Sequence, residues 1–150
     1  MIRINCGVAV EQLTDEHLLA EHRELKRFPS VFIKSLKSGS INKIPKEFCL
    51  GKGHILFFLN KQKYIYIRYA TIYCECLRRG FNVINYSDNW HDILDLLKEQ
   101  NCWNGYFPAF DGNLVIDRII ERIEKSSKTT WHYYGKPISK EEAIGKLIKR

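Results

Sequence analysis

Residues 18–27 read LLAEHRELKR, and this stretch lies in the middle of the first helix that the sequence predicts. Just before it, Thr14 or Asp15 can cap the helix, because a side-chain oxygen there accepts hydrogen bonds from free N–H groups of the first turn. Apolar side chains and one histidine then recur at helical spacing, at Leu18, His22, Leu25, Phe32 and Leu36. Pro29 interrupts this stripe, so we expect it to bend the helix, or to end it and start another.

Two further long helices and two shorter ones follow along the chain. The long ones are expected over about 61–79, where Gly80 can adopt the left-handed C-cap conformation, and over roughly 113–125. The shorter ones are expected over about 89–99 and 139–149. No strand alternation is sustained, and no repeat or linker divides the chain. The sequence therefore predicts an all-α fold, a single compact domain of three main helices with long loops.

Length and composition exclude several classes of protein. A chain of 150 residues that is 45% hydrophobic can bury a substantial core as one domain. The longest apolar run, in ILFFLN at 55–60, is far shorter than the ~20 residues that span a bilayer. The N-terminal stretch MIRINCGVAV lacks the apolar segment of a secretory signal. We therefore expect a protein with no membrane partner.

The cysteines and the charge indicate where the protein works and what it binds. The five cysteines form no C-x-x-C pair and no other metal-ligand spacing, so we expect free thiols, no metal and no cofactor. Free thiols are typical of a reducing compartment, which suggests the cytoplasm of a bacterial or virus-infected cell. The net charge of +7 is compatible with a phosphate-bearing partner, although many basic proteins bind nothing anionic.

Glu24 is a carboxylate among cations, with Arg23 and Arg27 close by on the same predicted helix. At 100° per residue, His17, Glu21 and Glu24 fall on one face of this helix. A nearby cation keeps such a carboxylate ionised, and an ionised carboxylate can stabilise a developing oxocarbenium ion or transfer a proton. The alternative is an ordinary surface ion pair between Glu24 and Arg27. The spacing alone leaves both interpretations open.

Two other segments carry weaker signals. LGKGH at 50–54 has the glycines of a phosphate-binding loop but not the rest of such a signature, so a structural turn is the better interpretation. WHYYGK at 131–136 places three aromatic rings, Trp131, Tyr133 and Tyr134, beside two potential cations. These rings could stack on exposed bases while Lys136 contacts phosphate, or they could pack on the helices.

The N-terminus itself offers a nucleophile. An α-amine has a pKa of about 7.7–8.0, far below that of lysine, so an appreciable fraction is neutral at physiological pH. A neutral amine is suited to Schiff-base formation with a sugar aldehyde. Arg3 lies close to this amine and could hold a phosphate next to it.

Five segments, in order along nearly the whole chain, carry a specific combination of these features. They are RIN at 3–5, LTDEHLLAEHREL at 13–25, LGKGHILFF at 50–58, ECLRRGFNV at 75–83 and TWHYYGKPI at 130–138. In this combination the chain resembles the pyrimidine-dimer DNA glycosylases with AP-lyase activity, the type first described as the endonuclease V of T-even phages.

This resemblance implies an all-α fold of three main helices and a DNA-repair reaction on duplex DNA. In the family, an N-terminal amine exposed by removal of the initiator methionine attacks the anomeric carbon of the 5′ nucleotide of a cyclobutane dimer. The matching amine here would be that of Ile2. A glutamate that matches Glu24 stabilises the cationic intermediate, and β-elimination from the imine then nicks the strand. The family is monomeric and acts on pyrimidine dimers and abasic sites without a cofactor.

The resemblance also implies a set of DNA-binding residues. Arginines that match Arg3, Arg23 and Arg27 bind phosphates around the lesion, and His17 matches a histidine of the same site. The aromatic segment with Trp131, Tyr134 and Lys136 helps to hold the DNA or the fold.

Ile2 departs from the family pattern, in which the second residue is a small threonine. Methionine aminopeptidases act poorly before bulky β-branched residues, so Met1 would remain and the amine would start up to ~3.5 Å further out. Either Met1 is removed nonetheless, or its own amine folds back into place, or the imine chemistry is lost. In the last case the protein would be a lyase-deficient glycosylase, or would bind and sequester a nucleotide or DNA lesion without turning it over.

Two regions look longer than in the phage enzyme. Residues 87–104 are expected to be an insert within the single domain 1–150, and residues 139–150 an additional C-terminal tail.

Overall fold

The first predicted helix is two helices in the computed structural model, which describes residues 4–51, 53–106 and 113–148. Helix α1 spans Asp15–Leu25, and Thr14 caps it by accepting the His17 N–H at 3.2 Å. Helix α2 spans Phe28–Ser38 with Pro29 in its first turn, where the missing N–H of proline is not needed. Of the two outcomes expected at Pro29, a bend or the start of a second helix, the structure has the second.

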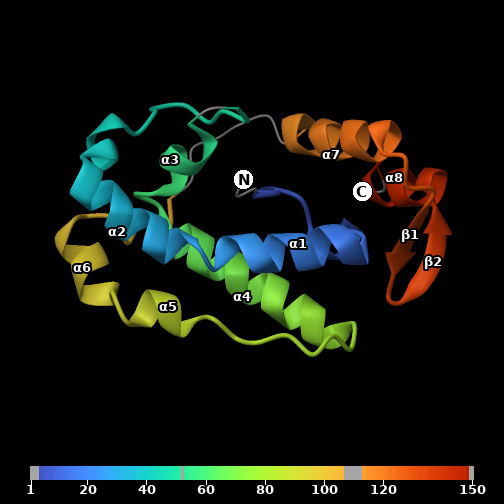
Figure 1. The fold of residues 1–150 in the computed structure, drawn as a ribbon, viewed down its shortest axis with the longest axis horizontal. Coiled ribbons are helices and arrows are strands. Elements are labelled where there is room, and N and C mark those ends of the chain that lie inside the picture. The colour runs from blue at the N-terminus through green and yellow to red at the C-terminus, as the bar shows by residue number, and fades with distance from the viewer. Residues whose placement is uncertain (1–3, 52, 107–112, 149–150) are drawn as a thin grey trace.

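Helix α4, Gln62–Arg78, packs against α1, and the two cross at the centre of the molecule (Figure 1). Gly80 follows it with a φ of 85°, so the predicted left-handed C-cap is present. The residues that α4 buries are largely apolar and include Ile65, Tyr69, Ile72 and Cys76.

Helix α7, Asn113–Lys125, confirms the third long helix of the prediction. Val115, Ile119 and Ile123 form its buried side. Helix α8, Lys140–Ile148, packs against it. In Figure 1 these two helices lie at one end of the molecule, and α2 and the shorter helices lie at the other.

The expectation of three main helices undercounts the fold. Within the described residues there are eight α-helices, including the short α3, His54–Phe58, and two 3₁₀ turns at Val10–Gln12 and Ser40–Lys43. The single helix expected over 89–99 is two helices, α5, Asp88–His91, and α6, Leu94–Glu99. They separate because the backbone of Ile93 has a φ of −120° and leaves the helical region. Among the described residues, no helix has the length and apolar character needed to cross a membrane.

The fold is not strictly all-α, because residues 130–139 form a β-hairpin. Strand β1, Thr130–Tyr133, pairs antiparallel with β2, Lys136–Ser139. The turn residues Tyr134 and Gly135 both have positive φ, at 52° and 76°, as a tight two-residue hairpin turn requires. Each strand has only four residues, which is too short for a visible alternation in the sequence. A Tyr-Gly turn also lacks the Asn-Gly signal that would have marked it.

The core joins the N-terminal segment to the helices. Ile4, Cys6 and Val8 are buried, as is an aromatic group that includes Phe28, Phe58, Tyr69 and Trp90. All five cysteines are free thiols, as the sequence predicted.

Candidate active site on helix α1

A cavity of about 270 Å³ lies along one side of α1. Helix α1, helix α7 and the N-terminal segment all contribute to its wall, which includes Asn5, His17, Glu21, Glu24, Ile119 and Arg122. The helical spacing placed His17, Glu21 and Glu24 on one face, and all three line this cavity. Arg122 comes from α7 and was not among the predicted residues, because only the fold brings it to α1.

Glu24 is the accessible carboxylate of this cavity. Its Oε2 accepts a hydrogen bond from Arg27 Nη1 at 3.1 Å, and its side chain is 29% exposed. The predicted pair between Glu24 and Arg27 is therefore present. Since the Arg27 side chain is itself 53% exposed, the pair is open to an incoming anion or sugar.

Glu21 lines the same cavity, but its charge is already balanced by that of Arg68. Arg68 binds its carboxylate with both Nε, at 2.7 Å, and Nη2, at 2.9 Å, and Asn5 donates a further hydrogen bond at 3.1 Å. The Glu21 side chain is fully buried. Although burial alone would lower the pKa of Arg68, its interactions with Glu21 raise it, so the pair stays charged. Of the two carboxylates, Glu24 is thus the one that could act on a ligand.

His17 lines the cavity as a neutral imidazole. Burial lowers its pKa, although the charges of Glu16 and Glu21 oppose this effect. Its Nδ1 lies 2.8 Å from Thr14 Oγ1, and its ring stacks on Trp131 with centroids 5.3 Å apart and an angle of 10° between the planes. His17 is therefore held in place by a cap residue and by the hairpin.

The lowered pKa of His17 predicts a pH dependence of stability. In the unfolded chain histidine titrates near ~6.5, and the folded state takes up the proton only at lower pH. Acidification below about pH 6.5 therefore favours the unfolded state, so the stabilisation is present above that pH and is lost as pH falls through the folded pKa. His17→Gln should lessen the drop in the free energy of unfolding between pH 7 and pH 5, measured by urea denaturation.

The control for this prediction is Asn89→Ala, which removes a side chain with no titratable group, an amide that donates to the Lys26 carbonyl at 3.1 Å. We expect it to leave the pH dependence as in the wild type. A His17→Gln protein with the full wild-type drop would contradict the role given to burial.

The three predicted residues of the hairpin do not line the cavity. Trp131 is only 7% exposed and lies against His17, so it reaches the cavity through that ring. The Tyr134 hydroxyl donates a hydrogen bond to Glu75 at 2.9 Å, which ties the hairpin to the end of α4. Lys136 lies exposed at the start of β2. The alternative in which the aromatic rings pack on the helices describes Trp131 well.

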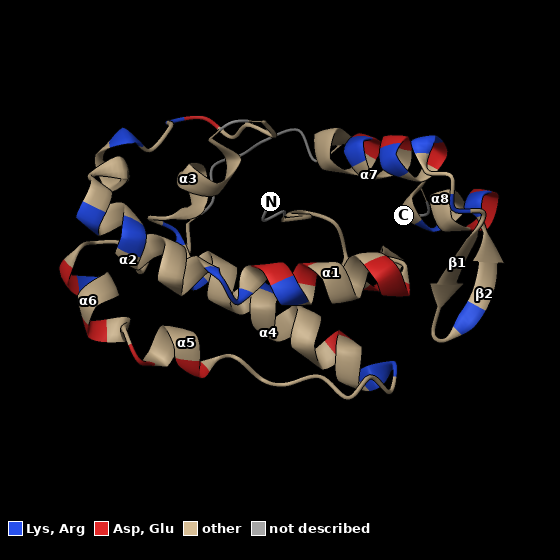
Figure 2. Cartoon of the chain, in the orientation of Figure 1, with Lys and Arg blue, Asp and Glu red and all other residues tan. Residues whose placement is uncertain are grey.

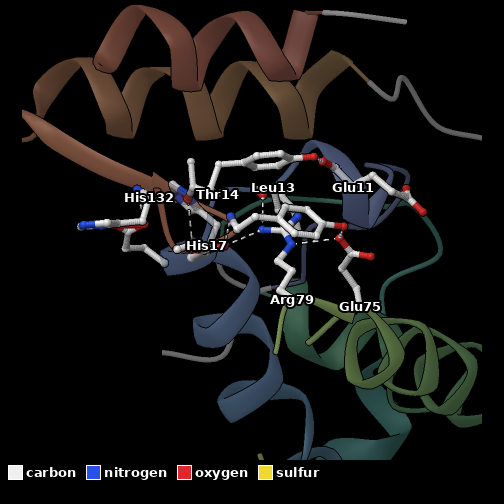
Figure 3. Close-up of polar contacts among 12 residues, drawn as sticks. Glu11, Leu13, Thr14, His17, Glu75, Arg79 and His132 are labelled. Carbon is white, nitrogen blue, oxygen red and sulfur yellow. Dashed lines mark hydrogen bonds and ion pairs between the residues drawn. The ribbon is translucent and has the colours of Figure 1, made fainter. Parts of the chain in front are cut away.

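A polar cluster that no sequence pattern predicted anchors this hairpin (Figure 3). Arg79, whose side chain is fully buried, donates to Glu75 at 2.9 Å, to Asp15 at 2.9 Å and to the Leu13 carbonyl at 2.8 Å. Asp15 in turn accepts the N–H groups of both turn residues, Tyr134 at 3.0 Å and Gly135 at 2.8 Å. The only sequence signal was the helical i,i+4 pair of Glu75 and Arg79.

The remaining predicted residues lie at the edge of the site or outside the described chain. Arg23 is exposed on α1, next to Glu24 in sequence. The predictions for Met1, Ile2 and Arg3 fall outside the described residues. Among the described residues, no group of three or more histidine, cysteine or acidic side chains is placed to hold a metal ion.

Charge is distributed unevenly around the site (Figure 2). The segment with α5 and α6 carries four acidic residues and one lysine, Asp88, Asp92, Asp95, Glu99 and Lys98. Helix α2 carries lysines and no acidic residue. Because phosphates are repelled by the acidic segment, an anionic polymer is better accommodated along α2, which Arg27 directly precedes.

The mainly helical domain has an accessible carboxylate, Glu24, beside the arginines Arg27 and Arg122. Such a cavity is typical of a protein that acts on a phosphate-bearing substrate. Residues 1–89 match the family model described as pyrimidine dimer DNA glycosylase, which covers α1 to α4 and the start of α5. The chain belongs to the pyrimidine dimer DNA glycosylase family. Membership implies repair of pyrimidine dimers, with damaged DNA as the substrate.

Proposed function

We propose that this protein is an N-glycosylase that removes cyclobutane pyrimidine dimers from duplex DNA and then cleaves the strand as an AP lyase. The observation that carries the proposal is the pairing of two features in one cavity. Glu24 is accessible there beside Arg27, and Asn5 brings the N-terminal segment to the same wall. Three residues of extended chain span at most ~10 Å, so an amine on residue 2 can be no further than this from Asn5.

The reaction begins when the neutral N-terminal amine attacks C1′ of the 5′ nucleotide of the dimer. The C1′–N bond breaks, and the base leaves with the bonding electrons and takes up a proton. The ionised carboxylate of Glu24 stabilises the positive charge that develops on the sugar. Ring opening then gives an imine between C1′ and the amine.

Strand cleavage follows from the imine. The iminium acidifies the C2′ hydrogen, a base removes that proton, and the C3′–O bond breaks so that the 3′ phosphate leaves. Glu24 is suited to transfer protons in these steps because it lies at the cavity and reaches solvent. Hydrolysis of the remaining imine regenerates the free amine.

Cations around Glu24 would hold the phosphates on either side of the lesion. We assign this role to Arg27, in the turn between α1 and α2, and to Arg122 of α7, with Arg23 of α1 beside them. We assign Arg3 to the same function from the family resemblance. His17 would position the sugar from the cavity wall, while Trp131 and Tyr134 support the site from the hairpin and Lys136 meets DNA at its outer edge.

The second candidate function is a protein that binds a nucleotide or lesion without turning it over. Ile2 is the observation that favours it, because retention of Met1 moves the amine by up to ~3.5 Å. A shift of that size can spoil the near-attack geometry of an amine.

Two samples of duplex plasmid, one irradiated with ultraviolet light and one untreated, are incubated with the protein in EDTA. Their cleavage distinguishes the two candidate functions. The glycosylase and lyase should nick only the irradiated plasmid, and DNA affinity should fall steeply with salt as counterions are released. Tight binding of a free nucleotide with intact irradiated plasmid would favour the binder instead.

We also propose that residues 1–150 act together as one monomeric domain in the cytoplasm. Residues 87–104 are integrated into the fold, since Trp90 Nε1 donates to Gln62 at 3.1 Å and the Gln62 N–H donates to the Cys102 carbonyl at 3.0 Å. The C-terminal tail is supported in the same way by the packing of α8 against α7.

A further inference from the structure

We propose that Asn5, Glu21 and Arg68 form a clamp that positions the N-terminal amine at the cavity. We call residues 4–8 the N-terminal arm. The inference rests on the proposed function, because it assigns these three residues to the placement of the nucleophile. They are positioning residues and not catalytic ones.

Glu21 and Arg68 hold the arm at two points. Asn5 Nδ2 donates to Glu21 Oε1 at 3.1 Å, while Arg68 Nη1 donates to the Val8 carbonyl at 2.6 Å. The same Arg68 binds both oxygens of Glu21 through Nε and Nη2. One buried ion pair between α1 and α4 therefore fixes residues 5 and 8 of the arm together.

The opposite side of the arm is held by α7 and by the core. Arg118 Nη2 donates to the Ile4 carbonyl at 3.2 Å, and Ile4, Cys6 and Val8 are buried. Gly7, with a φ of 80°, makes the turn that allows the Val8 N–H to reach the Asn5 carbonyl at 3.2 Å. In Figure 1 the start of the described chain accordingly lies beside α1 on the side that faces α7.

Stability alone does not require a charged pair here. A buried ion pair is often no more stabilising than well-packed apolar side chains of the same volume. Directional hydrogen bonds, in contrast, fix the register of the arm, since a slip of one residue would move its free end by ~3.5 Å. An error of that size in the position of a nucleophile costs a large part of its reactivity.

Asn5→Ala tests the clamp, because it removes the contact of the arm with Glu21 and leaves the Glu21–Arg68 pair intact. We expect the rate of borohydride-trapped adduct on an abasic duplex to fall roughly 10- to 100-fold in single turnover. Affinity for a duplex with an uncleavable tetrahydrofuran abasic analogue should change less than about twofold. Hydrogen exchange of a peptide that covers residues 4–8 should rise.

The matched control is Gln12→Ala, which removes another side-chain amide from the N-terminal region. The Gln12 amide donates to the Lys146 and Leu147 carbonyls, both at 3.2 Å, and therefore ties the chain to α8 and not to the cavity. We expect this variant to form the adduct at the wild-type rate, even where its unfolding midpoint falls as much as that of Asn5→Ala.

Three results would overturn the clamp. They are a wild-type adduct rate in Asn5→Ala, an equal loss of rate in both variants, and unchanged exchange of the arm in Asn5→Ala. If the wild-type protein itself forms no adduct, the proposed function fails separately. Increased exchange of the arm in Asn5→Ala would then still support the clamp.

Discussion

Glu24→Gln should lower strand cleavage of dimer-containing duplex by roughly 10²- to 10³-fold while the protein still binds that DNA. The amide has nearly the shape of the carboxylate but carries no charge to stabilise the developing cation and cannot take up a proton. Cleavage is measured in single turnover on a duplex with one defined dimer, and binding is measured on the same duplex with a tetrahydrofuran abasic analogue in place of the dimer.

Binding is expected to survive because Glu24 is not the group that holds phosphates. Its removal leaves Arg27, the partner at 3.1 Å, free to bind an anion. Affinity for DNA should therefore be equal to that of the wild type or tighter.

Glu99→Gln is the matched control, since it removes one negative charge from an exposed position on α6. It should leave the cleavage rate unchanged and should reproduce any general effect of net charge on affinity. If Glu24→Gln nicks dimer-containing DNA as fast as the wild type, the catalytic role of Glu24 is wrong.

Arg79→Ala should destabilise the fold by roughly 3–5 kcal/mol, a large share of the about 5–15 kcal/mol that holds a domain together. The Arg79 side chain is fully buried, and the substitution leaves Asp15 without its cation and Glu75 with only the exposed Arg78. In the wild type, burial raises the pKa of Glu75, but hydrogen bonds from Arg79 and Tyr134 outweigh this effect and the pKa is lowered. Without Arg79, burial acts against the charge of this carboxylate with less opposition. Urea denaturation measures the change.

Arg78→Ala is the comparison, because Arg78 pairs with the same Glu75 but its side chain is 58% exposed. Its loss leaves the Arg79 contacts in place and should change the free energy of unfolding by only a small fraction of the Arg79 effect. Equal effects of the two substitutions would show that the buried cluster does not anchor the hairpin.

The sequence predicted much of the helical framework, because local signals set it. These local signals are the cap at Thr14, Pro29 at the start of α2 and Gly80 after α4. Each acts within a few residues, and each has the predicted effect. The helical spacing of His17 and Glu24 likewise suffices to place both on one cavity.

Contacts between segments that are distant in the sequence could not be predicted from such local signals. Glu21 and Glu24 look alike in the sequence, and only Arg68, 47 residues away from Glu21, makes one of them buried and neutralised. Arg122 reaches the site through the packing of α7. The hairpin at 130–139 has strands too short to show a period, so its anchoring on Asp15 emerged only in three dimensions.

Borohydride trapping on abasic duplex DNA tests whether the N-terminal amine attacks the sugar. We expect a covalent adduct, and the crosslinked peptide, identified by mass spectrometry, should be the N-terminal one. The mass of that peptide would also show whether Met1 or Ile2 carries the sugar. DNA that is bound but forms no adduct, or an adduct on an internal lysine, would show that the N-terminal amine is not the nucleophile.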